Sequence, residues 1–112
     1  MLYLVLSAKT EGGTTMQNRQ VPEYLKSTLI MIQIAFPNGV NREQYFSLLY
    51  LLYDYMCDEN LAIVMAYVTG KNTASVTNDI WGINQRIIDN DCLLDTKNRL
   101  LKSGFASWIS DS

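Results

Sequence analysis

The feature that most constrains the fold is the turn Phe36-Pro37-Asn38-Gly39-Val40, which lies between two strongly apolar segments. Proline disfavours the helical conformation in the residue before it, and an Asn-Gly pair accepts positive φ. The turn therefore predicts the end of one helix and a change of direction before the next.

The segment before the turn predicts a helix that begins at Pro22, because proline suits the first helical turn, where its missing N–H has no partner. Apolar and small residues recur along it at spacings of three and four, which favours a helix with one buried face. That face comprises Tyr24, Leu25, Thr28, Leu29, Ile32, Ala35 and Phe36.

The segment after the turn predicts a second helix, with Asn41 as its cap and Gln44 completing a capping box. At about 100° per residue, its apolar side chains cover half of the helix surface from Tyr45 to Met56. A narrow polar stripe remains, made of Glu43, Ser47 and Asp54. We therefore expect this helix at the centre of a bundle.

Two further helices are predicted from caps and stops. Asp58 is the expected cap of a third helix, which contains the apolar stretch 61–68 and ends at Gly70. A polar loop over 71–75 separates it from a fourth helix at about 78–88. The fourth helix is expected to place three isoleucines on one face, namely Ile80, Ile83 and Ile87.

Asp95 opens the predicted fifth helix, which ends at Gly104. Three apolar residues after that stop are expected to fold back over the end of the bundle: Phe105, Trp108 and Ile109. Five short helices joined by short loops predict an all-α bundle.

Residues 1–15 are expected to form a peripheral N-terminal extension, and residues 16–112 a single helical-bundle domain. The apolar start, Met1 to Leu6, is too short for a signal peptide and has no basic segment before it. Translation from Met16 is the alternative to such an extension.

Charge and composition argue against nucleic acid and against a membrane as partners. The 112 residues carry a net charge of −2 and their nine basic residues are scattered, so nucleic acid is not an expected partner. No segment reaches the roughly 18 apolar residues of a membrane span. Two cysteines are too few for a disulfide framework, which favours reduced thiols in the cytoplasm.

The residue types argue against an enzyme and against a bound cofactor or metal. Histidine, the commonest general base and metal ligand, is absent. Phosphate-binding glycine motifs are absent too. Cys57 stands among carboxylates that disfavour its thiolate, so we interpret it as a small apolar residue of the structure.

One acidic segment begins like a calcium-binding loop, with Asp89, Asp91 and Asp95. Leu94 replaces the glycine that such a loop requires, and Leu100 replaces its bidentate glutamate. We therefore interpret the segment as a solvated connection between helices.

Aromatic residues are the remaining candidates for function. Tyrosine and tryptophan are enriched at protein interfaces, although most of these rings are expected to pack in the core or at its boundary. The candidate partner contacts at the edges of the buried surfaces are Tyr50, Leu51, Tyr67, Trp81 and Trp108.

The turn, the Tyr45-Phe46 pair and the leucine-rich helix after it resemble an uncharacterised, largely actinobacterial domain family. The resemblance spans about 29–105 and includes Asp79-Ile80 and the segment 100–105. It implies a small helical bundle and assigns no activity. The chain departs from the family where prolines are common, at Asn41 and Ser47, and in the terminal turn at 104–106.

Three functions stay open at this point. The first is a non-enzymatic cytoplasmic helical module that acts through protein–protein contact, with a second copy of itself as one candidate partner. The second is an inhibitor of the immunity or antitoxin kind, which is typically small, acidic and helical. The third is a small enzyme that uses carboxylates without histidine.

Overall fold

The structure, a computed structural model, describes residues 21–111, and over these residues the fold is all-α, as predicted. The expected extension, residues 1–15, lies outside the described residues. Within residues 21–111, six α-helices and two 3-10 turns follow one another: η2 (Glu23–Leu25), α1 (Lys26–Ala35), α2 (Arg42–Leu52), α3 (Asp58–Thr69), α4 (Thr73–Trp81), η3 (Ile83–Gln85), α5 (Asn90–Lys102) and α6 (Phe105–Asp111).

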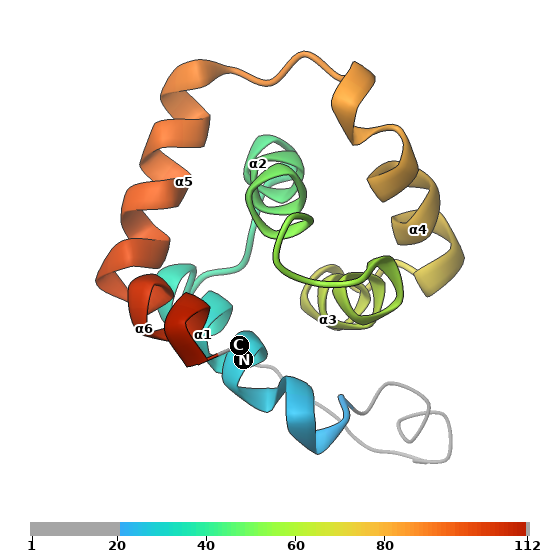
Figure 1. Cartoon of the computed structure of the whole chain (residues 1–112). Helices are drawn as coiled ribbons and strands as arrows, with labels where there is room; N and C mark the ends of the chain where they lie inside the picture. The colour runs from blue at the N-terminus through green and yellow to red at the C-terminus, as the bar shows by residue number, and fades with distance from the viewer. Residues whose placement is uncertain (1–20, 112) are drawn as a thin grey trace.

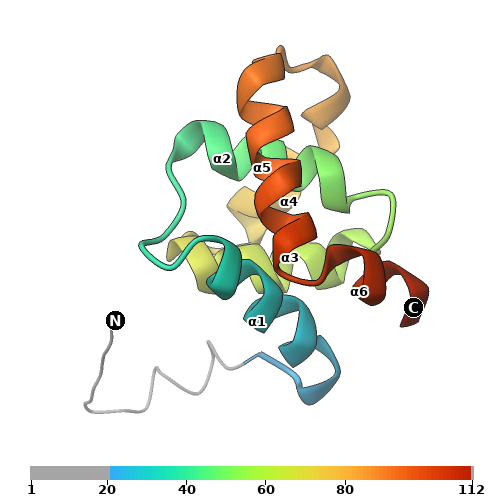
Figure 2. The ribbon, with the colours of Figure 1, turned by 90° about the vertical axis from the view of Figure 1, so that its left-hand side faces the viewer.

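Helix α2 is the centre of the fold, which confirms the expectation from its apolar surface. Figure 1 shows α2 nearly end-on, with α1, α3, α4 and α5 around it, and Figure 2 shows α5 crossing in front of it. Leu48, Leu49 and Leu52 are completely buried. Helices α3 and α5 pack against α2, whereas α4 packs on α3 and α6 packs on α5 and α1.

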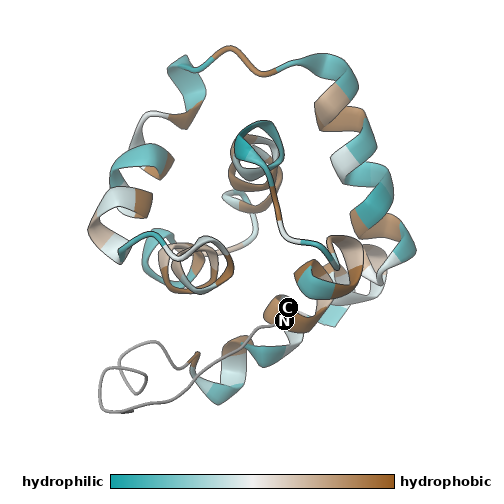
Figure 3. Cartoon of the chain, turned by 180° about the vertical axis from the view of Figure 1, so that it is seen from behind, coloured by the Kyte–Doolittle hydropathy of each residue, from teal (hydrophilic) through white to brown (hydrophobic). Residues whose placement is uncertain are grey.

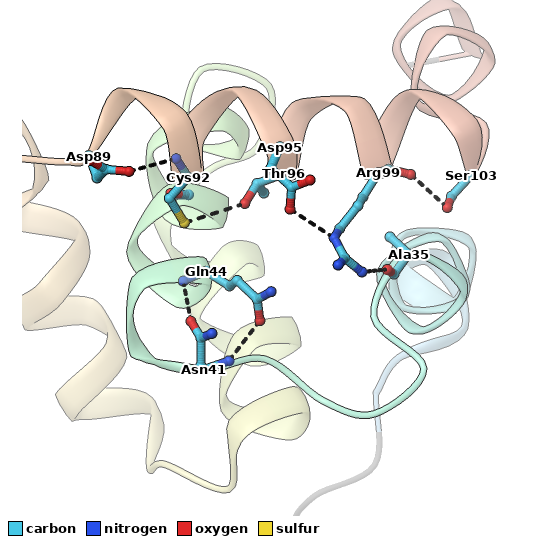
Figure 4. Close-up of polar contacts among 10 residues, drawn as sticks. Ala35, Asn41, Gln44, Asp89, Cys92, Asp95, Thr96, Arg99 and Ser103 are labelled. Carbon is cyan, nitrogen blue, oxygen red and sulfur yellow. Dashed lines mark hydrogen bonds and ion pairs between the residues drawn. The ribbon is translucent and has the colours of Figure 1, made fainter.

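The turn at 36–40 joins α1 to α2 as the sequence predicts. The Gly39 N–H donates to the Phe36 carbonyl at 3.0 Å, and Gly39 has φ of 90°, a value that favours glycine. The expected capping box is present: Gln44 N–H donates to the Asn41 side chain at 2.8 Å, and Asn41 N–H donates to the Gln44 side chain at 2.9 Å (Figure 4).

The first helix begins later than predicted. Pro22 precedes the short turn η2, and the α-helical geometry starts only at Lys26. Tyr24, which was assigned to the buried face, is 68% exposed because η2 rotates it away from the face that α1 buries. Phe36 is buried but lies just beyond the last residue of α1.

Ser47 was expected on a solvated stripe of α2, and this was wrong: it is completely buried. Helix α5 packs on that side of α2, and the Ser47 hydroxyl donates to Cys92 Sγ at 3.5 Å. Helix α2 also ends at Leu52, so Tyr53, Tyr55 and Met56 lie beyond it.

The expected cap of α3 was wrong, whereas its expected stop is confirmed. Cys57 occupies the N-cap position without a side-chain hydrogen bond, and Asp58 accepts instead from Trp81 Nε1 at 3.1 Å. Gly70 ends the helix in the left-handed conformation, with φ of 79°. Cys57 is exposed, so it does not serve as a buried apolar residue.

Helices α4 and α5 begin earlier than predicted because two side chains act as caps in segments expected to be loops or connections. Asn72 accepts from Ser75 N–H at 2.8 Å, which starts α4 at Thr73. Asp89 accepts from Cys92 N–H at 2.9 Å, which starts α5 at Asn90 (Figure 4). The predicted cap Asp95 lies within α5.

The predicted fourth helix also ends early, at Trp81, and only two of its three isoleucines are buried. Ile80 and Ile83 belong to the core, but Ile87 is 98% exposed. It lies in the loop between η3 and α5, part of which appears as an apolar stretch at the top of Figure 3.

The C-terminal segment folds back over the bundle end, as expected, and does so as a helix of its own, α6. Gly104 has φ of 101°, which favours glycine at the tight turn between α5 and α6. Phe105 is 3% exposed, and Trp108 and Ile109 pack against the core from its edge.

Candidate functional site

An apolar groove runs between α1, α6 and the segment that follows α2. It has a volume of about 700 Å³. We call it the groove, and its large apolar and aromatic lining residues include Tyr24, Ile30, Ile34, Tyr55, Met56 and Trp108. Several of these side chains are more exposed than is usual for their type.

One wall of the groove is the outer face of α1. Ile30 and Ile34 are 52% and 60% exposed, and residues four apart on a helix lie one turn above the other. Leu29 and Ile32 on the same helix are buried. Helix α1 therefore carries two large apolar side chains on its outer side, among Lys26, Ser27 and Gln33, in addition to its buried inner face.

Tyr55 and Trp108 also line the groove, and they belong to a cluster of three rings with the buried Phe105. Phe105 and Trp108 stack with centroids 5.8 Å apart, and the Tyr55 ring meets both edge-on, at 5.8 and 6.2 Å. Trp108 Nε1 donates to the Thr28 hydroxyl on α1 at 2.8 Å. That bond connects the ring cluster to α1.

Formal charge is sparse in the groove. Among its lining residues Asp111 is the one charged side chain, and the other polar groups are uncharged: serine, threonine and tyrosine hydroxyls, an asparagine amide, a thiol and the tryptophan N–H. Tyr24 donates to Asn60 Oδ1 at 3.2 Å, which connects η2 to α3. The groove can accept an apolar surface and a single cation beside Asp111.

The five predicted partner contacts do not gather at this groove. Trp108 lines it, whereas Tyr50, Leu51, Tyr67 and Trp81 do not. Tyr50 packs against Tyr53 with ring centroids 6.1 Å apart, and Leu51 is half-buried against the core. Tyr67 and Trp81 are exposed on α3 and α4.

Ile30 and Ile34 were not among the predicted partner contacts, although the sequence carries a signal for them. The stretch from Leu29 to Ala35 is apolar apart from Gln33, so more apolar side chains are available than one buried face can take. A helix that is apolar all round is either fully buried or covered by something else.

A second hollow, of about 340 Å³, opens at the N-terminal end of α2. We call it the charged pocket, and its charged and aromatic lining residues are Arg42, Tyr45, Phe46, Lys71, Asp79 and Arg86. The Tyr45 hydroxyl donates to Asp79 Oδ2 at 2.6 Å, and Lys71 Nζ lies 3.0 Å from the same oxygen. The Lys71 ammonium also lies over the Tyr45 ring, 4.5 Å from its centroid.

These contacts shift two pKa values in opposite directions. Burial, the hydrogen bond to Asp79 and the charge of that carboxylate raise the pKa of Tyr45 far above its usual value, against a smaller opposing effect of Arg86. Partial burial alone would raise the pKa of Asp79. The hydrogen bonds from Tyr45 and Lys71, with the charges of Lys71 and Arg86, outweigh burial and lower that pKa. Tyr45 therefore stays neutral and Asp79 ionised at neutral pH.

The acidic segment expected to be a solvated connection instead begins helix α5. Asp89 caps the helix, Asp91 lies in its first turn, and Asp95 forms an ion pair with Arg99 at 3.0 Å. Within residues 21–111, no three His, Cys, Asp or Glu side chains are grouped so that they could hold a metal ion. The groove and the charged pocket are each lined by a single carboxylate, Asp111 and Asp79 respectively.

The helices of the described region are short. None of them combines the length and the apolar character needed to cross a membrane.

Comparison of the chain with protein-family models, curated proteins and solved structures finds no match. The resemblance to an actinobacterial domain family therefore stays a prediction. The groove and the charged pocket are therefore the features of the molecule that bear on its function.

Proposed function

We propose that this chain is a non-enzymatic cytoplasmic interaction module, whose groove binds an amphipathic helix of a partner protein. The observation that carries the proposal is the exposure of Ile30 and Ile34 beside the Tyr55–Phe105–Trp108 ring cluster. Contiguous apolar surface of this kind marks interaction sites on soluble proteins.

The shape and chemistry of the groove favour a helical ligand. Two helices, α1 and α6, form its sides, and Ile30 and Ile34 repeat at the spacing of one helical turn. Helix-in-groove recognition uses apolar anchors at such spacings. Asp111 supports a partner helix with a lysine or arginine near one end, since that is the one formal charge in the lining.

A cytoplasmic setting is supported by the cysteines. Cys57 and Cys92, the two cysteines of the chain, are both free thiols. Unpaired thiols are typical of proteins kept in a reducing compartment.

The proposal is tested with Ile34→Asp and a matched control, Ile87→Asp. Both isoleucines are exposed, so neither substitution places a charge in the core, but only Ile34 lines the groove. A tagged copy of the wild-type chain is expected to recover a partner from lysate, and Ile34→Asp is expected to weaken its purified complex at least about 30-fold, the effect of a hot-spot residue. Ile87→Asp is expected to bind like the wild type.

Sedimentation of the purified chain distinguishes a second copy from another protein as the occupant. A dimer that Ile34→Asp dissociates would identify a second copy of this chain in the groove. A strictly monomeric chain that recovers no partner would contradict the proposal. Equal effects of Ile34→Asp and Ile87→Asp would contradict the groove as the binding site.

A further inference from the structure

The charged pocket carries an excess of positive charge in a chain whose net charge is −2. Arg42, Lys71 and Arg86 line it, against the single carboxylate of Asp79. The three cations come from the start of α2, from the segment between α3 and α4, and from the segment after η3. The fold therefore brings together charges that are scattered along the sequence.

Neither arginine forms an ion pair with a carboxylate among the described residues, although the Arg86 charge acts on Asp79 from a greater distance. The Arg86 guanidinium lies 3.6 Å from the centroid of the Phe46 ring, and that of Arg42 lies 5.2 Å from the same centroid. Within residues 21–111, neither guanidinium forms an ion pair or donates a hydrogen bond at the distances that define one. A guanidinium on a ring face keeps its N–H donors at the edge, where a ligand can accept from them.

Asp79 lines the pocket, but its carboxylate repels an anionic ligand less than a free carboxylate would. Its Oδ2 atom accepts from both the Tyr45 hydroxyl and the Lys71 ammonium, at 2.6 and 3.0 Å. These two donors compensate much of the carboxylate charge inside the pocket. The Arg42 and Arg86 charges then stay available to a ligand.

We propose that the charged pocket binds the phosphate group of a small phosphate monoester, held between the guanidinium groups of Arg42 and Arg86. Three cations and one carboxylate leave two positive charges, and a phosphate monoester carries about −1.5 to −2 at neutral pH. Arginine matches phosphate oxygens with paired N–H donors. The volume of about 340 Å³ suits a phosphate with a small organic group attached, and Val40 offers that group an apolar contact.

The test is an NMR titration of the full chain that follows the Nε–H signals of Arg42 and Arg86. The probes are inorganic phosphate and phenyl phosphate, with acetate as a monoanion control. Saturable shifts are expected with both phosphates and weaker ones with acetate. Affinity for phenyl phosphate is expected to be higher at pH 8 than at pH 5, because the second pKa of a phosphate monoester is about 6.

Arg86→Gln and Arg42→Gln are each expected to weaken binding of phenyl phosphate about tenfold or more. Lys97→Gln removes the same charge from an exposed site on α5 outside the pocket and is expected to change affinity less than about twofold. Circular dichroism of each variant verifies that the fold is retained, and Arg86→Lys, which keeps the charge, is expected to bind with intermediate affinity.

Three results would overturn the proposal. The first is the absence of saturable shifts with either phosphate, and the second is an equal loss of affinity in Lys97→Gln and Arg86→Gln. The third is binding of a phosphoserine peptide without binding of phenyl phosphate, which would contradict a small-molecule ligand.

Discussion

The carboxylate of Asp79 binds two other side chains, those of Tyr45 and Lys71. Asp79 Oδ2 accepts from both neighbours, and Lys71 in turn covers the face of the Tyr45 ring. Three elements are joined in this way, because Tyr45 lies on α2, Asp79 on α4 and Lys71 between α3 and α4. The Asp79 side chain is 23% exposed, so these bonds are partly shielded from water.

Asp79→Asn is expected to lower the free energy of unfolding at pH 7 by about 1 kcal/mol, since the bond to Lys71 is partly exposed. The pKa of Asp79 is lowered in the folded state, so its charge stabilises the fold above the unfolded pKa near 3.8. That contribution is lost as pH falls through the lower, folded pKa.

Urea denaturation at pH 7, 5, 4 and 3 measures the effect. The difference between the wild type and Asp79→Asn should shrink as pH falls below about 4. Asp54→Asn, at an exposed residue whose side chain forms no hydrogen bond or ion pair in the described part of the chain, is the control and should change stability by less than about 0.5 kcal/mol. A difference between wild type and Asp79→Asn that stays constant from pH 7 to 3 would contradict this account.

At the scale of elements, the contact between α2 and α5 depends on small polar side chains. Ser47 and Thr96 are both completely buried, and Cys92 lies between them, with its sulfur 3.5 Å from the Ser47 hydroxyl and 4.0 Å from the Thr96 hydroxyl. Small side chains let the two helices approach closely. Hydrogen bonding within the trio limits the cost of burying polar groups.

Ser47→Leu is expected to destabilise the protein by about 1–3 kcal/mol, because the larger side chain overpacks the contact between α2 and α5. Glu43→Leu, an exposed position one turn earlier on α2, is the matched control and should have little effect. Thermal and urea denaturation of both variants would measure the difference. If Ser47→Leu were neutral, the packing of α5 against this side of α2 would be in question.

The elements were predicted well where the signal is local. The turn at 36–40, the Asn41 capping box and the Gly70 stop each depend on a few adjacent residues, and all three are confirmed. The predicted starts of α4 and α5 were wrong. Asn72 and Asp89 cap these helices because the backbone at both residues is extended, and the local sequence does not reveal that conformation. Several Asn, Asp and Ser residues near those starts had similar local preferences.

At the scale of the whole molecule, α6 closes the ring of helices around α2 (Figure 1). Phe105 is buried and stacks on Trp108, and Trp108 reaches α1 through Thr28. Arg99 adds a second connection, since its guanidinium donates to the Ala35 carbonyl at 3.3 Å (Figure 4). Trp108 on α6 and Arg99 on α5 thus both connect to α1.

Phe105→Ala is expected to destabilise the protein by about 3–5 kcal/mol, the usual cost of removing a buried ring. Leu94→Ala, at a side chain that is 60% exposed on α5, is the control and should cost about 0.5 kcal/mol. Equilibrium urea denaturation compares the two variants. A cost for Phe105→Ala no larger than that of the control would show that α6 contributes little to closing the fold.

The candidate sites were harder to predict than the fold. Trp108, which lines the groove, was predicted as a partner contact because it is aromatic. Ile30 and Ile34 also line the groove, but their exposure depends on which elements cover α1 and is not visible in the sequence. The charged pocket had no sequence signal, because Arg42 and Arg86 are far apart in the chain and only the fold places both guanidinium groups near the Phe46 ring.

The sequence by itself determined the all-α class, the central place of α2 and the main turn, because helix caps, stops and apolar periodicity act over a few residues. Only the tertiary structure decided which polar residues are buried and which apolar ones are exposed. Ser47 is buried because α5 packs over it, and Ile34 is exposed because no element in the described residues covers that side of α1. Burial depends on neighbours distant in sequence, and for that reason both candidate binding surfaces emerged from the fold.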